Sequence, residues 1–92
     1  MYSPLAILDL KRIQDFLLPK NPLAAKRAAE TILKNLKILS FQPEMGRLID
    51  ELPDEFREWP IDFGDSGYLV RYRYDGEQIL IIAIRHQKEF GF

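Results

Sequence analysis

Apolar residues recur at helical spacing over the first part of the chain. They form one stripe made of Leu5, Leu8, Ile13, Phe16 and Leu17. Ser3-Pro4 supplies an N-cap and a proline at the first helical position, where its missing N–H would be unpaired anyway. Pro19 biases the preceding Leu18 away from helical dihedrals. The pattern predicts a first helix that begins at Ser3-Pro4 and ends before Pro19.

A second helix is predicted to follow almost at once. Asn21-Pro22 repeats the cap-then-proline arrangement, and the segment from Leu23 to Leu39 carries alanines, leucines and an isoleucine at helical spacing. Alanine favours the helix and leaves a thin surface that another helix can approach closely. Because the Pro-Lys-Asn-Pro link is short, the two helices are predicted to lie antiparallel as a helical hairpin.

The apolar period changes from helical to alternating in the second half of the chain. A connection at Phe41–Gly46, with Gly46 either ending the crossover or beginning a short strand through Ile49, leads to an alternating segment at Phe56–Phe63. Pro60 cannot donate to a strand ladder, so this strand is predicted to be an edge or to be bulged there.

Two further strands complete the predicted sheet. Gly67–Tyr74 alternates, and Asp75-Gly76 is a strong signal for a two-residue hairpin turn. Ile79–Ile84 is almost continuously apolar, which predicts a central strand covered on at least one face. The predicted fold is α+β, an N-terminal antiparallel helical hairpin packed on a three- to four-stranded antiparallel sheet.

Composition narrows the class of protein. With 92 residues the chain has room for a single domain, which we expect to span residues 1–92. It has no cysteine and one histidine, His86, so neither a disulfide nor a metal site is predicted, and no cofactor is expected. No apolar run approaches the ~20 residues of a membrane span, and no signal peptide is visible, so a cytoplasmic protein is expected.

The charge is nearly balanced overall but is unevenly distributed. Thirteen basic and fourteen acidic residues give a formal net charge of −1, which argues against non-specific nucleic-acid binding as the main activity. The segment Glu44–Asp65 holds eight acidic residues against Arg47 and Arg57. Between Arg71 and Lys88 the balance is reversed, so basic and acidic surfaces are expected to be separate.

Short motifs occur in a fixed order across nearly the whole chain. They are Ser3-Pro4 with Ala6 and Asp9-Leu10, Asn21-Pro22-x-Ala24-Ala25, Pro43-x-x-Gly46-Arg47, Arg57-Glu58, Gly67-Tyr68 with Tyr72-Arg73, and Ile82-Ala83-Ile84-Arg85-His86-x-x-Glu89. Together they resemble the RelE/ParE superfamily, the toxins of type II toxin–antitoxin pairs. The family begins with a short strand before the Ser-Pro, and only Met1-Tyr2 stand there in this chain, so that strand is expected to be short or missing.

The resemblance implies one of two activities. RelE-like members cut mRNA on the ribosome with lysine, arginine and often a terminal tyrosine, whereas ParE-like members poison DNA gyrase. At the positions that resemble the ribonuclease residues, this chain has Pro60, Asp62, Leu69 and Phe92, which supply neither cations nor a hydroxyl. The lack of cations and of a hydroxyl at these positions favours the ParE branch, and therefore an inhibitor that binds a protein over an enzyme.

Six side chains are candidates for binding the target or the antitoxin: Arg57, Arg71, Arg73, Arg85, His86 and Lys88. In a RelE-like ribosome-dependent endonuclease, Arg71, Arg73, Arg85 and His86 would be the catalytic set. A simpler interpretation is that Arg71 and Arg73 pair with the acids of Glu44–Asp65 on a solvated strand face. His86 is then a partly buried residue at the end of the sheet, and Tyr68, Tyr72, Tyr74 and Trp59 belong to the core and its rim.

Binding to a partner protein is a further expectation. The resemblance implies a ParD-like antitoxin whose disordered tail folds across the helical hairpin and along the sheet. DNA gyrase is the implied target, no direct specific nucleic-acid binding is expected of the chain alone, and no membrane is involved. A non-toxic family member that only binds an antitoxin is the remaining alternative.

Overall fold

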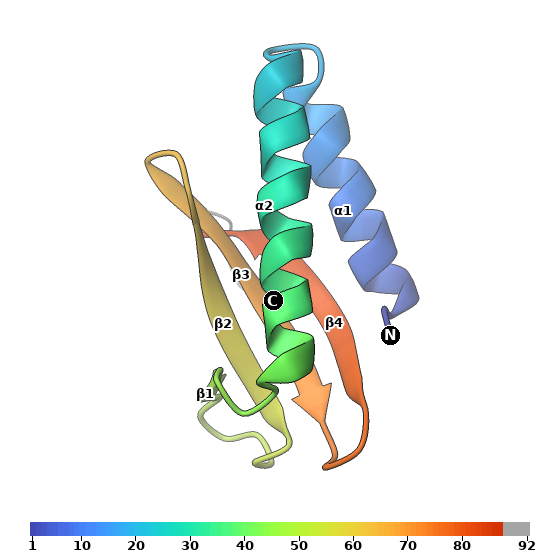
Figure 1. Ribbon diagram of the computed structural model, residues 1–92, viewed down its shortest axis with the longest axis vertical. Helices are drawn as coiled ribbons and strands as arrows, with labels where there is room; N and C mark the ends of the chain where they lie inside the picture. The colour runs from blue at the N-terminus through green and yellow to red at the C-terminus, as the bar shows by residue number, and fades with distance from the viewer. Residues whose placement is uncertain (88–92) are drawn as a thin grey trace.

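The computed structural model describes residues 1–87 as two helices followed by four strands (Figure 1). The elements are α1 (Pro4–Leu17), α2 (Pro22–Phe41), β1 (Arg47–Leu48), β2 (Phe56–Phe63), β3 (Ser66–Tyr74) and β4 (Ile79–His86). The strands form one antiparallel sheet in the order β1-β2-β3-β4. The α+β fold predicted from the sequence is therefore confirmed.

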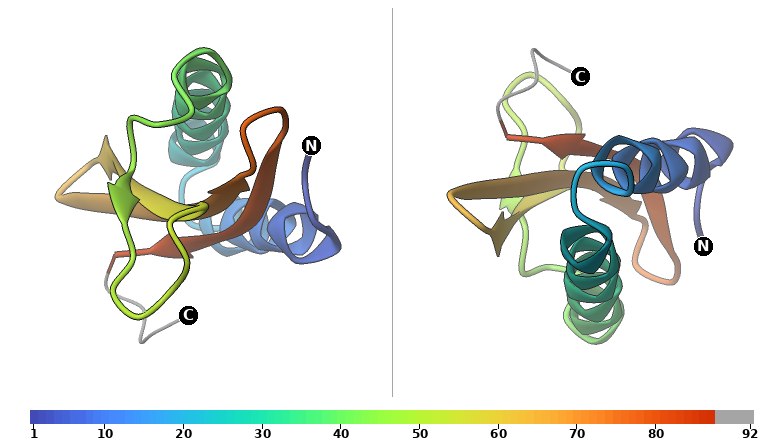
Figure 2. Two further views of the ribbon diagram at one scale, coloured as in Figure 1. Left: turned by 90° about the horizontal axis from the view of Figure 1, so that it is seen from below. Right: turned by 90° about the horizontal axis from the view of Figure 1, so that it is seen from above.

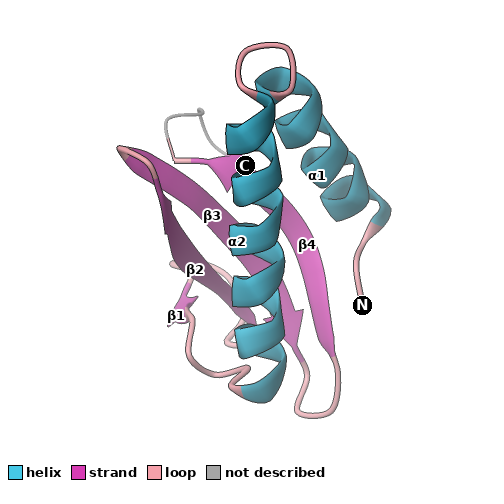
Figure 3. Cartoon of the chain, turned by 45° about the horizontal axis from the view of Figure 1, so that its top comes forward, coloured by secondary structure: helices cyan, strands magenta, loops and turns pink. Residues whose placement is uncertain are grey.

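Both helices begin with the caps that the sequence predicts. Ser3 Oγ accepts a hydrogen bond from the backbone N–H of Ala6 at 3.0 Å, and Asn21 Oδ1 accepts one from Ala24 at 3.1 Å. Figure 3 shows the resulting hairpin, with the two helices antiparallel around a short link. Within residues 1–87 neither helix is long and apolar enough to cross a membrane.

The two helices cover different parts of the sheet. Figure 2 shows α2 over one face, α1 along the side of β4, and the loop after β1 on the opposite face. The core lies between α2, α1 and the sheet, and its largest fully buried side chains are Tyr72, Ile32, Leu39, Ile61, Ile84 and Val70. Tyr74 and Trp59 pack against this core from partly buried positions.

The prediction that Ile79–Ile84 is a central strand is wrong, because β4 is the last strand of the sheet. Its apolar run has another cause: the helices cover one face, and the N-terminus and α1 cover the outer edge. Ser3 N donates to Ile81 O at 2.8 Å, and Ile81 N donates to Met1 O at 2.9 Å. The expected short first strand is thereby reduced to a parallel bridge between Tyr2 and Ile81.

The turn between β3 and β4 is also longer than predicted. Tyr74 pairs with Ile79, so the strands are joined by the four residues from Asp75 to Gln78, with Asp75 N donating to Gln78 O at 3.4 Å, and not by Asp75-Gly76 alone. Asp75 Oδ1 accepts from the backbone N–H groups of Glu77 and Gln78, each at 2.9 Å. These two bonds stabilise a longer turn that the Asp-Gly pair alone does not indicate.

Pro60 stands where β2 has no outer neighbour. The two residues of β1 pair only with Arg57 and Glu58, which leaves the outer side of β2 at Pro60 unpaired among the described residues. On the inner side Pro60 lies opposite Leu69 in a continuous register. β2 is therefore not an edge strand along its whole length, but within residues 1–87 it has a free outer side at Pro60. The irregularity of the sheet lies between β3 and β4 at Arg71/Tyr72.

Candidate functional site

The sheet presents the predicted arginines on the face away from α2. Arg71 and Arg73 alternate along β3 with the buried Tyr68, Val70 and Tyr72, so they point to the other face. Arg85 lies opposite Leu69 and shares that face. We call this surface the arginine face; its members are Arg47, Glu58, Pro60, Asp62, Leu69, Arg71, Arg73 and Arg85.

Carboxylates neutralise much of the arginine face. Glu58 Oε1 pairs with Arg47 Nη2 at 2.8 Å, and Glu58 Oε2 lies 3.6 Å from Arg71 Nη2. Glu55 Oε2 pairs with Arg73 Nη2 at 3.2 Å, and hydrogen bonding to Glu55 raises the pKa of Arg73 above its ordinary value. The pairing of Arg71 and Arg73 with nearby acids, the simpler of the two interpretations, is therefore present.

The four residues named as a ribonuclease set do not share one surface. His86 lies opposite Tyr68 on the helix-facing side of the sheet, whereas Arg71, Arg73 and Arg85 are on the arginine face. Pro60 and Asp62 are exposed on the arginine face as well. Lys88 lies outside the described residues.

Arg57 serves the fold. Its Nη1 donates to the backbone oxygens of Glu44 at 3.1 Å and Gly46 at 2.8 Å. The Tyr72 hydroxyl completes the cluster by donating to Pro43 O at 2.7 Å and accepting from Gly46 N at 2.9 Å. Burial is the main cause that raises the pKa of Tyr72 above its ordinary value of 10.0. Together these contacts hold the connection between α2 and β1 against the sheet.

Glycine is the only residue type that fits at position 46 of this cluster. A Cβ at this position would overlap the Tyr72 hydroxyl oxygen and would lie 2.9 Å from Glu58 O. The Gly-Arg pair singled out in the sequence is thus explained by close backbone approach.

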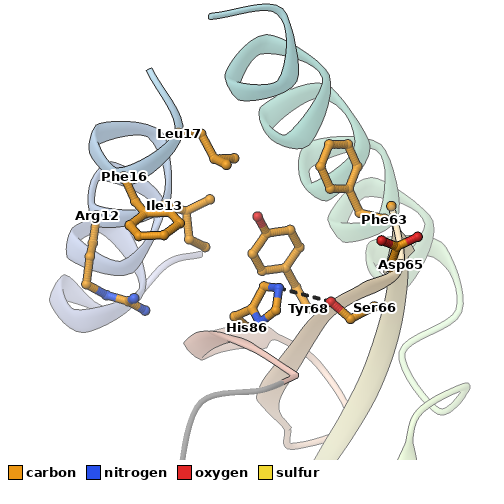
Figure 4. A pocket seen from close by; sticks show the side chains of 10 residues that line it. Arg12, Ile13, Phe16, Leu17, Phe63, Asp65, Ser66, Tyr68 and His86 are labelled. Carbon is orange, nitrogen blue, oxygen red and sulfur yellow. Dashed lines mark hydrogen bonds between the residues drawn. The ribbon is translucent and has the colours of Figure 1, made fainter. Parts of the chain in front are cut away.

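A pocket of about 670 Å³ opens on the helix side of the sheet, at the end of α1 (Figure 4). Its apolar walls come from Ile13, Phe16, Leu17, Phe63 and Tyr68. Its polar groups are Arg12 from α1, Asp65 and Ser66 from the β2–β3 turn, and His86 from β4. Of the pocket residues, only His86 is a candidate from the sequence. The signal for the other pocket residues is Phe16, an apolar side chain that lies one helical turn after an arginine and stays 61% exposed.

His86 is fixed on the floor of this pocket. Its Nε2 and Ser66 Oγ share a hydrogen bond of 3.0 Å, whose direction depends on the imidazole tautomer. The ring meets Tyr68 edge-on, with centroids 5.4 Å apart and planes at 87°. His86 is partly buried, as the simpler interpretation expected. Within residues 1–87 no group of three His, Asp or Glu side chains could hold a metal ion.

Known proteins are similar to this chain in sequence and fold. A family model described as the ParE toxin of the type II toxin–antitoxin system parDE matches residues 1–90. The chain is 34% identical over 87 residues to "Toxin RelE3" of Caulobacter vibrioides, covering 95% of this chain and 91% of that protein. It is 32% identical over 81 residues to "Toxin RelE1" of the same organism, covering 88% and 84%.

A solved structure has the same architecture. The structure titled "Chromosomal ParDE TA system from P. aeruginosa" superposes with a TM-score of 0.75 at 22% identity, covering 92% of this chain and 90% of that one. A helical hairpin on a small antiparallel sheet is thus the fold of a type II toxin of the RelE/ParE class. The chain belongs to the ParE toxin family.

Proposed function

We propose that this chain is a ParE-like toxin that inhibits DNA gyrase by protein binding in the cytoplasm and is neutralised by a ParD-like antitoxin. One observation carries the choice against RNA cleavage: the charge balance of the arginine face. Arg47 and Arg71 are paired with Glu58, Arg73 is paired with Glu55, and Pro60 and Asp62 stand exposed beside them.

Metal-free RNA cleavage needs two groups on one surface. A base must activate the 2′-hydroxyl, and cations must stabilise the pentavalent phosphorane. On the arginine face Asp62 would repel the phosphate, and Glu58 holds two of the guanidinium groups. His86, the natural candidate for a base, lies on the other side of the sheet. The surface is better suited to contact with a protein of mixed charge.

A RelE-like ribosome-dependent mRNA endonuclease is the second candidate. It is favoured by the two relatives from Caulobacter vibrioides, which carry the names RelE3 and RelE1. In that case Arg85, opposite Leu69 on the arginine face, would be the first residue to test. A chain that only binds an antitoxin would show neither activity.

The proposed antitoxin would meet the helical hairpin. Residues 1–41 carry seven basic side chains against three acidic ones, a net charge of +4, and several apolar side chains remain exposed there. The exposed ones include Leu5, Leu8, Phe16, Leu23, Leu33 and Phe41. Such a surface suits the amphipathic, acidic tail expected of a small ribbon-helix-helix protein encoded beside the toxin.

Induced expression of the chain separates these candidates. Filamentation with trapped gyrase–DNA cleavage complexes supports the proposal, whereas cleavage of mRNA on translating ribosomes would overturn it. The variant Arg85→Ala distinguishes them further, because it should abolish mRNA cleavage only if the endonuclease is real. Co-expression with the small reading frame next to the gene should suppress toxicity and yield a complex of the two proteins. Absence of toxicity in both assays would leave antitoxin binding alone.

A further inference from the structure

The pocket at the end of α1 has no role in the mechanism described above. We propose that it anchors an acidic amphipathic segment of the antitoxin: a large apolar side chain enters the pocket, and a neighbouring carboxylate pairs with Arg12. The inference rests on the proposed function, because it names how the partner of that function is recognised.

The walls of the pocket suit one large apolar group. Its volume of about 670 Å³ falls within the roughly 300–1,000 Å³ of specific ligand sites. Phe63 and Tyr68 stand with ring centroids 6.1 Å apart on one side, and Phe16 stands on α1 across the opening (Figure 4). Buried aromatic anchors in such a recess supply most of the binding energy at protein interfaces.

Arg12 is held in position for an anion. Its Nη2 lies 3.6 Å from Asp9 Oδ1 and donates to Ile84 O at 3.5 Å, while 44% of the side chain stays exposed. Asp9 itself is only 3% exposed and accepts from Ile84 N at 2.9 Å, so the Nη2 group of the guanidinium is fixed at the sheet edge. A guanidinium carries five N–H donors in a planar fork that matches a carboxylate.

The charges around the opening give the ligand a direction. Arg12 lines one side of the pocket on α1, whereas Asp65 lines it from the β2–β3 turn. A carboxylate is attracted to the first side and repelled by the second, so the acid of the partner segment should lie along α1. Lys20 lies 3.7 Å from the Phe16 ring centroid and adds a further cation at this end.

The pocket continues into a surface that a helix could cover. Leu8, Lys11, Arg12, Asp15 and Phe16 line an adjoining depression on α1, where Leu8 is 62% and Phe16 61% exposed. Exposed apolar side chains flanked by cations, on a hairpin of net charge +4, fit an amphipathic acidic partner. A second copy of this chain would have to present its own acidic half, and that alternative is an outcome of the test.

The first experiment probes the pocket by NMR on the ¹⁵N-labelled full chain. Indole-3-propionate has an aromatic body and a carboxylate, tryptamine has the same ring with a cation, and propionate has the acid alone. We expect only indole-3-propionate to shift the amides of Ser66, Gly67 and His86. Equal shifts with tryptamine, or shifts centred on another surface, would overturn the proposal.

Two neighbouring cations provide a matched pair of variants. Arg12→Gln should weaken binding of indole-3-propionate about tenfold, the value of one charge-assisted hydrogen bond. Lys11→Gln removes the same charge one residue away, from a side chain that is 73% exposed and does not line the pocket, and should leave affinity within about twofold. If the two variants behave alike, the assignment of Arg12 is wrong. The amide spectrum of each variant shows whether it is folded.

The second experiment uses the antitoxin complex obtained from co-expression. Arg12→Gln and Phe16→Ala should each raise the dissociation constant about tenfold or more. Lys11→Gln should raise it by less than about threefold, because its exposed side chain lines only the adjoining depression and not the pocket. If the chain is toxic and is neutralised by the antitoxin, but the dissociation constant does not change on Arg12→Gln or Phe16→Ala, this inference is overturned and the proposed function is not. Failure of toxicity and of complex formation would instead remove the proposed function, even if the probe still binds. Light scattering that shows a dimer lost on Phe16→Ala would assign the pocket to a second copy.

Discussion

Tyr72 holds the segment between α2 and β1 against the sheet through a single hydroxyl. Its side chain is fully buried, and the oxygen both donates to Pro43 O and accepts from Gly46 N. We expect Tyr72→Phe to lower the free energy of unfolding by about 1–3 kcal/mol, because it leaves two backbone groups without a partner. Urea unfolding measures the change.

Tyr74→Phe is the matched control for this prediction. The Tyr74 hydroxyl donates to Gly76 O at 3.1 Å in an exposed turn, where water can replace it. Its loss should cost no more than about 0.5 kcal/mol. Equal effects of the two substitutions would mean that the Tyr72 hydroxyl does not hold the connection.

Asp75 makes the stability of the β3–β4 turn dependent on pH. Backbone N–H groups of Gln78 and Glu77 bond to its carboxylate and hold its pKa below the ordinary value of 3.8. A lowered pKa in the folded state means that the contribution is complete above the unfolded pKa and is lost as the pH falls through the folded one.

A pH series of melting temperatures tests this effect. Asp75→Asn keeps an acceptor oxygen but cannot titrate, so its melting temperature should fall less than that of the parent between pH 5 and about 2. Asp75→Ala should lose turn stability at every pH. A parallel acid profile for parent and Asp75→Asn would show that the carboxylate charge contributes nothing.

The outer edge of β4 depends on α1 for its hydrogen bonds. Asp9, with 2% of its surface exposed, accepts from Ile84 N at 2.9 Å, and Ser3 Oγ donates to Ile82 O at 2.7 Å. An edge strand whose N–H and C=O groups are satisfied in this way cannot accept another strand. Strand addition by a partner is therefore expected at β2 and not at β4.

Asp9→Ala tests the closure of this edge. It should destabilise the chain by about 1–3 kcal/mol, because the buried N–H of Ile84 loses its acceptor, and amide hydrogen exchange at Ile84 should become faster. Asp15→Ala removes an acid from the same helix whose partner is the exposed Lys11, and should change stability by less than about 0.5 kcal/mol. Unchanged exchange at Ile84 would contradict the role of Asp9.

The elements that could be predicted from the sequence are those with local causes. Ser3-Pro4 and Asn21-Pro22 begin the helices because each cap bonds to an amide three residues later. The edge position of β4 could not be predicted, since it depends on Asp9 bonding to a residue 75 positions away. The long turn after Tyr74 depends on which amides the Asp75 side chain reaches, and the Asp-Gly pair is compatible with either length.

The candidate site could be predicted by residue type and not by position. The sequence indicates which arginines are available, but whether a cation is free or paired depends on the register that places Glu58 opposite Arg71. Alternation along β3 places Arg71 and Arg73 on one face, and the bulge at Arg71/Tyr72 changes how they are matched to β4. The pocket brings together residues from α1, the β2–β3 turn and β4, which no local pattern connects.

The two parts of the molecule carry net charges of opposite sign. Residues 1–41 have seven basic and three acidic side chains, and residues 42–92 have six basic and eleven acidic ones, so the two parts carry +4 and −5. A field of this kind steers an acidic partner toward the helical hairpin and repels it from the other part. Long-range attraction of this sort acts on the association rate and is screened by salt.

Binding of the co-expressed antitoxin should therefore slow with salt. Between 50 and 500 mM NaCl we expect the association rate constant to fall about tenfold or more, with the dissociation rate constant changing much less, as measured by surface plasmon resonance. Lys34→Glu on the exposed side of α2 should lower the association rate at low salt, and Glu30→Lys on the same helix should raise it. Because both side chains are exposed and the substitutions are opposite in sign, a general loss of folding cannot produce this pair of results. An association rate that does not respond to salt or to either substitution would show that the apolar side chains of the hairpin recognise the partner without electrostatic guidance.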